Sequence, residues 1–199
     1  MIRGSIVALV TPFDEVGAID YSAIRRLVDY HVENGTRGIV AVGTTGESPT
    51  LSHQEDKSVI EAVVIAADGR IPVIAGAGSN STSEAILLTE AAQEAGADGI
   101  LSVVPYYNRP SQEGLINHFS AVAKSTDLPI ILYNVPKRTG TDLLNKTACI
   151  LSEVDNIVGI KDATGDLDRG RKLIEIVPEK FLVYSGDDHT ALKLTLAGG

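Results

Sequence analysis

The sequence is poor in cysteine and in basic residues, and each shortage excludes a class of protein. Cys149 is the only cysteine among the 199 residues, so no internal disulfide can form. Lysine and arginine number 17 against 26 acidic residues and form no basic stripe, so we expect neither nucleic acid nor anionic membrane as a partner. No apolar run approaches the roughly 18 residues of a membrane span, and the amino terminus lacks a secretory pattern. We therefore expect a cytoplasmic protein.

Several catalytic motifs are also missing. The four histidines are scattered without metal-ligand spacing, so no metal is expected. The chain has neither the Gly-x-Ser-x-Gly of a hydrolase nor a Gly-Lys-Ser/Thr phosphate loop. Asp187 and Asp188 suggest a cation site, but neighbours in an extended segment point to opposite faces. We interpret this pair as the start of a helix.

Short apolar segments alternate with amphipathic ones along the chain. The pattern predicts strands over residues 5–10, 38–42, 72–76, 99–104, 129–133, 157–160 and 181–184. It predicts helices over residues 21–34, 55–67, 83–95, 112–124, 143–154 and 168–177. The predicted helix caps are Asp20, Ser52, Ser81, Ser111 and Asp166, and the predicted left-handed helix stops are Gly35 and Gly96.

This alternation indicates an α/β fold with a parallel sheet and right-handed crossovers. A (β/α)8 TIM barrel and an open doubly wound sheet both fit. The first strand is followed by Thr11-Pro12-Phe13 rather than by a glycine fingerprint, and Gly76-Ala77-Gly78-Ser79 is only half of one. We therefore favour the barrel, here lacking its eighth β/α unit. No linker divides the sequence, so residues 1–199 are predicted to form one catalytic domain.

Polar residues crowd the carboxyl ends of the predicted strands, where parallel α/β enzymes carry their active sites. Lys161 follows the apolar run 157–160. Burial there would lower the pKa of its ammonium, and the free amine would be a nucleophile for carbonyls. A hydroxyl chain of Thr45, Tyr133 and Tyr107 would relay the protons that imine formation requires.

Two further groups suit a substrate that carries carboxylates. Thr44 and Thr45 lie in a glycine-flanked turn whose N–H groups would hold one carboxylate, and Arg138 offers a bidentate grip on a second. Each feature alone has an ordinary alternative: a lysine paired with Asp162, a simple turn, a packing tyrosine or a solvated arginine. Their joint occurrence at successive strand ends favours catalysis.

The same segments resemble the dihydrodipicolinate synthase family. The shared motifs are Gly43-Thr44-Thr45-Gly46-Glu47, Tyr133-Asn134-Val135-Pro136-x-Arg138-Thr139-Gly140 and Gly159-Ile160-Lys161-Asp162. The similarity runs from Gly4 to the end of the chain. It implies a class I aldolase-like lyase on a (β/α)8 barrel, with no metal or organic cofactor. Pyruvate would form an imine with Lys161, and the enamine would attack aspartate semialdehyde in the first committed step of lysine and diaminopimelate biosynthesis.

The resemblance also implies roles for single residues. Thr45, Tyr133 and Tyr107 correspond to the proton relay, with Tyr107 reaching into the site of a neighbouring subunit. The implied substrate-binding residues are Thr44, Thr45, Arg138 and Gly186. Arg138 would hold the semialdehyde carboxylate, and the Gly186 carbonyl would lie near the imine. The implied assembly is a homotetramer built from two tight dimers.

Two alternatives stay open at this point. N-acetylneuraminate lyase and the keto-deoxy sugar acid aldolases share the lysine and the tyrosine of the fifth strand but differ where Arg138 stands, so Arg138 favours the synthase. A truncated, non-catalytic remnant would bind pyruvate without a covalent adduct.

The resemblance further implies regulation by lysine and a longer chain. Some family members bind lysine in a dimer-interface cleft, and the matching positions are Ser48, His53, Asn80, Glu84 and Tyr106. Pro49 and Asp56 depart from the residues usual there, an alanine and a frequent histidine. The family chain continues past Gly199 to an eighth strand and a helical tail. We therefore expect these residues to be part of a longer polypeptide.

Overall fold

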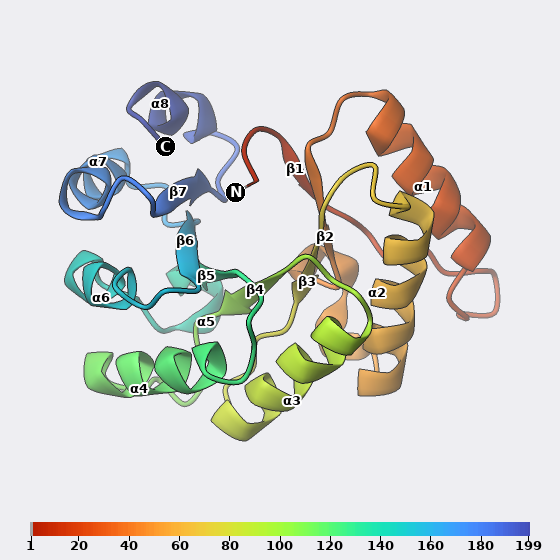
Figure 1. Cartoon of the computed structure of the whole chain (residues 1–199), viewed down its shortest axis with the longest axis horizontal. Helices are drawn as coiled ribbons and strands as arrows, with labels where there is room; N and C mark the ends of the chain where they lie inside the picture. Colours follow the sequence, from red (N-terminus) through yellow and green to blue (C-terminus); the bar gives the residue numbers. More distant parts are fainter. Residues whose placement is uncertain (1) are drawn as a thin grey trace. The chain divides into compact units, whose positions relative to one another are not determined.

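The computed structural model describes residues 2–199, which contain seven strands in the sheet order β1-β2-β3-β4-β5-β6-β7 (Figure 1). The strands are β1 (Ile6–Ala8), β2 (Gly38–Ala41), β3 (Val73–Gly76), β4 (Gly99–Val103), β5 (Ile130–Asn134), β6 (Ile157–Asp162) and β7 (Leu182–Ser185). The helices are α1 (Tyr21–Glu33), α2 (His53–Ala67), α3 (Thr82–Glu94), α4 (Gln112–Ala123), α5 (Pro136–Thr139), α6 (Asn145–Leu151), α7 (Leu167–Ile176) and α8 (Ala191–Leu196), with 3-10 turns η1 (Thr44–Gly46) and η2 (Ser48–Thr50). Among the residues described, no helix combines the length and apolar character needed to cross a membrane.

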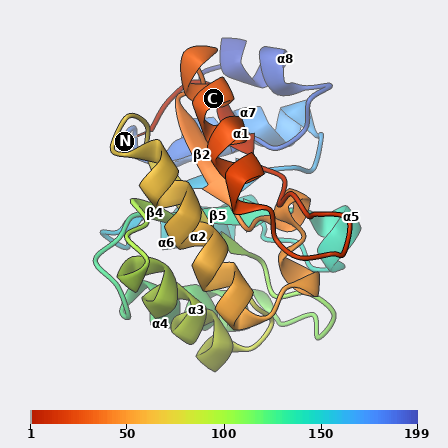
Figure 2. The ribbon, with the colours of Figure 1, turned by 90° about the vertical axis from the view of Figure 1, so that its right-hand side faces the viewer.

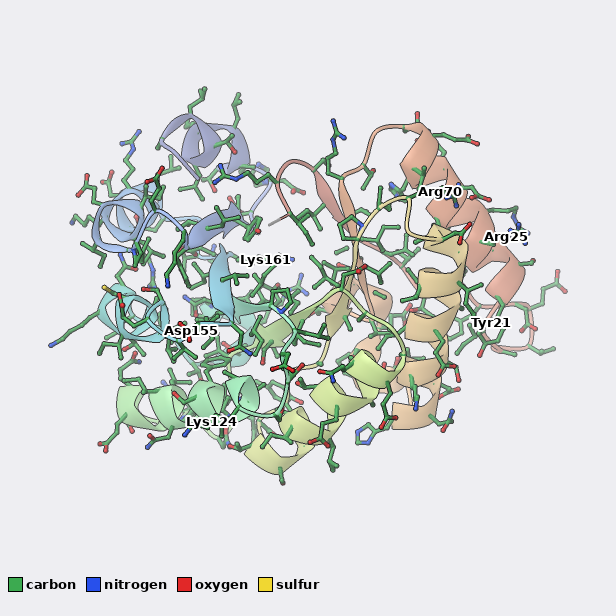
Figure 3. The ribbon with its side chains drawn as sticks, in the orientation of Figure 1. Tyr21, Arg25, Arg70, Lys124, Asp155 and Lys161 are labelled. Atoms are coloured by element: carbon green, nitrogen blue, oxygen red, sulfur yellow. The ribbon has the colours of Figure 1, made fainter. Side chains whose placement is uncertain are left out.

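The first compact unit comprises the chain up to Ala77 together with Leu88–Leu101. Strands β1, β2, β3 and the start of β4 pair in parallel within it. Helices α1 and α2 lie side by side (Figures 1 and 2). Arg70, labelled in Figure 3, follows α2 and donates to the Asp29 carboxylate of α1 over 2.6 Å. Packing therefore joins consecutive β/α pairs in this unit.

The second compact unit comprises Gly78–Leu87 and Ser102–Gly199. Within it β5, β6 and β7 pair in parallel, and α4, α6, α7 and α8 follow one another along the helical layer (Figure 1). Fully buried apolar side chains fill the space between strands and helices, among them Leu115, Phe119, Leu132, Leu151 and Leu173. This buried layer holds β5 and β6, the two strands that carry the central candidate residues.

Four of the five predicted helix caps and both predicted glycine stops are confirmed. Asp20, Ser111 and Asp166 cap their helices, and Ser52 forms a capping box with Glu55. Ser81 as a side-chain cap stays a prediction. The helix stops are confirmed as left-handed, with φ of 79° at Gly35 and 84° at Gly96.

Several predicted boundaries are wrong, and three of the differences lie near the candidate residues. Strand β6 continues through Lys161 to Asp162, because both residues pair with β5 and β7. Helix α6 begins at Asn145 rather than at Leu143, because the Leu143 N–H donates to the Asn134 side chain and holds the preceding segment extended. Asp187 and Asp188 do not start a helix, since α8 begins at Ala191 and Asp187 accepts from the Thr190 N–H in the turn before it.

Candidate active site

Lys161 occupies the centre of the second unit's parallel strands. Its Cα pairs with Tyr133 on β5 and with Tyr184 on β7. Figure 3 shows Lys161 on the side of β6 that faces away from α6 and α7. Its Nζ lies 4.5 Å from the centroid of the Tyr133 ring, and that ring is buried. The lysine and the tyrosine predicted to act together are thus adjacent.

The surroundings of Lys161 favour its neutral amine. Burial lowers the pKa of Lys161, the Arg138 guanidinium lowers it further, and the Asp188 carboxylate acts in the opposite direction. Because only the unprotonated amine attacks a carbonyl, a lowered pKa increases the reactive fraction at neutral pH. The electrostatics therefore agree with the predicted nucleophile.

Gly186 leaves the space that the Lys161 side chain occupies. A Cβ at this position would lie 2.8 Å from the Lys161 Cε and 2.9 Å from the Ala163 Cβ. The Gly186 N–H donates to the Asp162 carbonyl over 2.7 Å, which ties it to the residue next to Lys161. A Cβ here would require the Lys161 side chain and Ala163 to shift, so glycine suits the position for steric reasons.

Arg138 lies on α5, directly after β5. Pro136 occupies the first turn of this short helix, and Gly140 ends it in the left-handed region with φ 69°. The Arg138 side chain is exposed, and its positive charge lowers the pKa of Lys161. Contact between this exposed guanidinium and a substrate carboxylate stays a prediction.

Tyr107 is held on strained backbone and points outward. Its φ is 72°, a conformation that residues with a side chain seldom adopt, and 89% of the residue is exposed. The Tyr107 N–H donates to the Thr139 carbonyl over 3.2 Å. Asn80 binds the residues on both sides of Tyr107: its side-chain amide donates to the Tyr106 carbonyl, and its backbone carbonyl accepts from the Asn108 side-chain amide. A ring so exposed has little contact with its own chain, so its place in a relay stays a prediction that requires a second subunit.

Thr44 and Thr45 belong to the first compact unit, in the 3-10 turn η1 after β2. Both threonines are exposed. A hydrogen bond from the segment after β1 holds the turn in place, because the buried Thr11 hydroxyl donates to the Gly46 carbonyl over 2.6 Å. The structure thus presents the two residues on a hydrogen-bonded turn, and their approach to Lys161 stays a prediction.

The residues predicted to bind lysine are distributed over both units. Ser48 and His53 lie in the first unit beside Asp56, a residue that is 6% exposed. Burial raises the pKa of Asp56 to about 7, against the opposing effects of His53 and Ser48. In the second unit, Asn80 contacts Tyr106 and Glu84 accepts from the Ser79 hydroxyl. Lysine binding by these residues stays a prediction.

Sequence reasoning missed a polar cluster on the opposite face of β5 and β6. The Asn134 amide donates to Asp142 over 3.0 Å, and the Arg169 guanidinium donates to the same carboxylate over 2.8 Å. Arg169 also lies 3.7 Å from the Asp162 carboxylate. The only signal in the sequence was the polar residue directly after each of Tyr133 and Lys161. Among residues 2–199, no group of three histidine, cysteine or acidic side chains is arranged to hold a metal ion.

A lysine of lowered pKa on an inner strand of a parallel α/β sheet, with a tyrosine ring 4.5 Å from its amine, is the kind of site that lysine-dependent, imine-forming lyases use. The model of the dihydrodipicolinate synthetase family matches residues 1–199. A 4-hydroxy-tetrahydrodipicolinate synthase from Azoarcus sp. is 60% identical over 199 residues, which are 100% of this chain and 68% of that protein. The chain belongs to the dihydrodipicolinate synthetase family.

Solved structures match the chain over nearly all of its length. The chloride-inhibited dihydrodipicolinate synthase from Acinetobacter baumannii, complexed with pyruvate, matches with a TM-score of 0.98 and 56% identity, over 100% of this chain and 68% of that one. The enzyme from Cyanidioschyzon merolae with lysine bound matches with a TM-score of 0.95 and 44% identity, over 98% and 67%. The predicted fold class, a (β/α)8-type α/β architecture with seven strands present, is confirmed.

Proposed function

We propose that this chain catalyses the condensation of pyruvate with L-aspartate 4-semialdehyde to 4-hydroxy-tetrahydrodipicolinate. The observation that carries the proposal is the half-buried Lys161, whose pKa is lowered and whose Nζ lies 4.5 Å from the Tyr133 ring centroid. Relatives at about 58% identity carry the name of this synthase. The product belongs to lysine and diaminopimelate biosynthesis.

The reaction follows from an amine in this setting. The Lys161 amine attacks C2 of pyruvate, and loss of water gives the imine. Loss of a C3 proton gives the enamine, whose C3 forms a bond to the aldehyde carbon of the semialdehyde while the aldehyde oxygen gains a proton. The amino group of the semialdehyde then attacks the imine carbon, the ring closes, and the Lys161 amine leaves. Every covalent step uses only the two substrates and this lysine.

The proton transfers and the two carboxylates are assigned to separate groups. The Thr45 hydroxyl, the Tyr133 phenol and a neighbouring subunit's Tyr107 form the proton relay. The Thr44–Thr45 turn holds the pyruvate carboxylate, and Arg138 holds that of the semialdehyde through a charge-assisted hydrogen bond. The Gly186 carbonyl lies near the imine.

The assembly and location follow from these roles. A relay tyrosine that is 89% exposed in its own chain is complete only with a second copy, which supports a dimer, and the assembly we propose is a homotetramer of two such tight dimers. Residues 1–199 act as a single catalytic domain. The enzyme works in the cytoplasm, where the intermediates of amino-acid biosynthesis are made. Free lysine regulates it through Ser48, His53, Asn80, Glu84 and Tyr106.

Borohydride trapping tests whether the Lys161 Nζ forms the imine with pyruvate. Reduction in the presence of pyruvate should add one reduced pyruvyl group at Lys161, located by peptide mass spectrometry. Lys161→Arg should abolish the label. Lys172→Arg should keep it, because Lys172 is an exposed lysine on α7. Folded protein that gains no label, or is labelled at another lysine, would remove Lys161 as the nucleophile.

A substrate comparison tests the second half-reaction. Aspartate semialdehyde should be consumed faster than N-acetylmannosamine or a sugar-acid aldehyde when each is offered with pyruvate. The reverse order would assign the chain to another aldolase of the same superfamily.

A further inference from the structure

We infer that Arg169 of α7 is a positioning residue that fixes Tyr133 and Lys161 by clamping the residue that follows each of them. The inference rests on the proposed function, in which these two side chains act together. The pairs Tyr133↔Lys161 and Asn134↔Asp162 are consecutive in the parallel register of β5 and β6. Because side chains alternate along a strand, Asn134 and Asp162 point away from the catalytic face.

Asn134 and Asp162 are both buried and therefore require partners. Asn134 is 0% exposed and Asp162 is 6% exposed. The Asn134 amide donates to the Asp142 carboxylate, and its carbonyl oxygen accepts from the Leu143 N–H over 3.1 Å. The Asp162 carboxylate accepts from the Thr164 N–H over 2.7 Å. Buried polar groups left without partners cost free energy, so the positions of Asn134 and Asp162 depend on these hydrogen bonds.

Arg169 joins the two strand ends. Its Nη1 donates to Asp142 over 2.8 Å, and its Nη2 donates to the Leu143 carbonyl. Its Nε lies 3.7 Å from the Asp162 carboxylate and, within residues 2–199, makes no hydrogen bond. Arg169 is therefore linked to β5 by hydrogen bonds through Asp142, and to β6 by the charge attraction between its guanidinium and Asp162. One guanidinium serves two carboxylates, and its side chain is only 18% exposed.

Arg169 is itself held in place from two directions. The Asp166 carboxylate caps α7 by accepting from the Arg169 N–H over 3.0 Å. The Asn145 amide at the start of α6 donates to the Arg169 carbonyl over 2.9 Å. Because the Arg169 backbone is held at these two points, its guanidinium can hold the carboxylates of Asp142 and Asp162 in fixed positions.

The clamp reaches the amine through a short chain of contacts. The Asp162 carbonyl accepts from the Gly186 N–H, and Gly186 packs against the Lys161 side chain. A shift of Asp162 would therefore move both the lysine backbone and the glycine that packs against the lysine side chain. Misplacement of a reacting group by about 1 Å costs about a hundredfold in rate.

Arg169→Met tests the clamp, with Arg171→Met as the matched control. Both arginines are on α7, but within residues 2–199 the one ion pair of Arg171 is with Asp168 on the helix surface. With saturating pyruvate, Arg169→Met should slow formation of the borohydride-trapped imine about tenfold to a hundredfold. The KM for pyruvate should change little, because its carboxylate is held elsewhere. Arg171→Met should match the wild type in both values.

Competitive acylation of Lys161 across pH, normalised to Lys172, provides a second measurement that needs no substrate. Arg169→Met leaves the Asp162 carboxylate without its cation, so the apparent pKa of Lys161 should rise. Arg169→Lys keeps the charge toward Asp162 and should restore that pKa while leaving imine formation slow. The other groups facing Lys161 are Tyr133, Arg138, Tyr184 and Asp188, and none of them is changed.

The outcomes distinguish the positioning role of Arg169 from the proposed reaction with pyruvate. Wild-type behaviour of Arg169→Met in both measurements overturns the inference. If that variant does not fold, Arg169→Lys and Asp142→Asn provide the same comparison, and a wild-type imine rate in both overturns it. If wild-type protein forms no imine but its Lys161 acylation profile responds to Arg169, the clamp stands and the proposed function fails.

Discussion

Gly186→Ala should impair imine formation, because the added methyl group would occupy the space of the Lys161 side chain. The new Cβ would lie 2.8 Å from the Lys161 Cε, 3.1 Å from its Cγ and 2.9 Å from the Ala163 Cβ. Carbon atoms pack best at about 3.5–4.0 Å, so relief of the closest contact requires a shift of about 0.7 Å or more. The lysine side chain is the movable partner, and moving it displaces the amine.

The magnitude follows from these contacts. Overpacking of this kind costs about 1–3 kcal/mol. If the cost appears in the positioning of the amine, imine formation slows by about one to two orders of magnitude, at about 1.4 kcal/mol per factor of ten. Glycine is not needed here for backbone freedom, since Gly186 is not among the residues with positive φ. The effect should therefore be steric and local, with a small change in melting temperature.

Rapid-quench borohydride trapping with pyruvate measures the effect in a single turnover. Gly114→Ala is the matched control, because Gly114 lies in the first turn of α4 and alanine favours helix there. Gly114→Ala should trap pyruvate as fast as the wild type. A Gly186→Ala protein that traps it equally fast would refute the steric reasoning and show that the lysine adapts without loss.

The remaining predictions concern charge and regulation. Arg138→Ala should slow condensation about tenfold to a hundredfold through loss of a charged hydrogen bond of about 1.5–3 kcal/mol; the imine should still form, but its pH profile should move upward, because removing that cation raises the pKa of Lys161. An unchanged profile, measured beside Arg138→Lys, would contradict this. Asp56 binds its proton more tightly in the folded state, with a pKa raised from 3.8 to about 7, so stability should fall as pH rises from about 4 to 7. Asp56→Asn should exceed the wild type in stability above pH 7 by about 1–3 kcal/mol, less than the full 1.36 kcal/mol per pKa unit because solvent screens the carboxyl, and urea unfolding at pH 5 and pH 8 should reveal a difference that grows with pH. Millimolar lysine should lower activity and Glu84→Thr should abolish that response, whereas calorimetry without lysine binding to active enzyme would exclude this regulation.

Sequence alone was sufficient for features that depend on near neighbours in the chain. The alternation of apolar runs and amphipathic segments predicted all seven strands, because a strand buried between helices must be apolar over its length. Asp20 and Ser52 marked helix starts, since a capping side chain bonds an N–H group only two or three residues away. Lys161 was found for the same reason, as a charged residue next to a short apolar run.

Contacts between distant residues were decided only by the tertiary structure. Arg169 bonds Asp142, which is 27 positions away, and no local pattern identifies that partner. The lowered pKa of Lys161 likewise depends on burial and on Arg138, which approaches from another element. Strand β6 extends to Asp162 because β5 and β7 supply partners there, although the apolar pattern ends at Ile160. Helices and strands follow from short-range sequence because their bonds and caps are local, whereas the reactivity of the lysine depends on charges and packing that only the folded chain brings together.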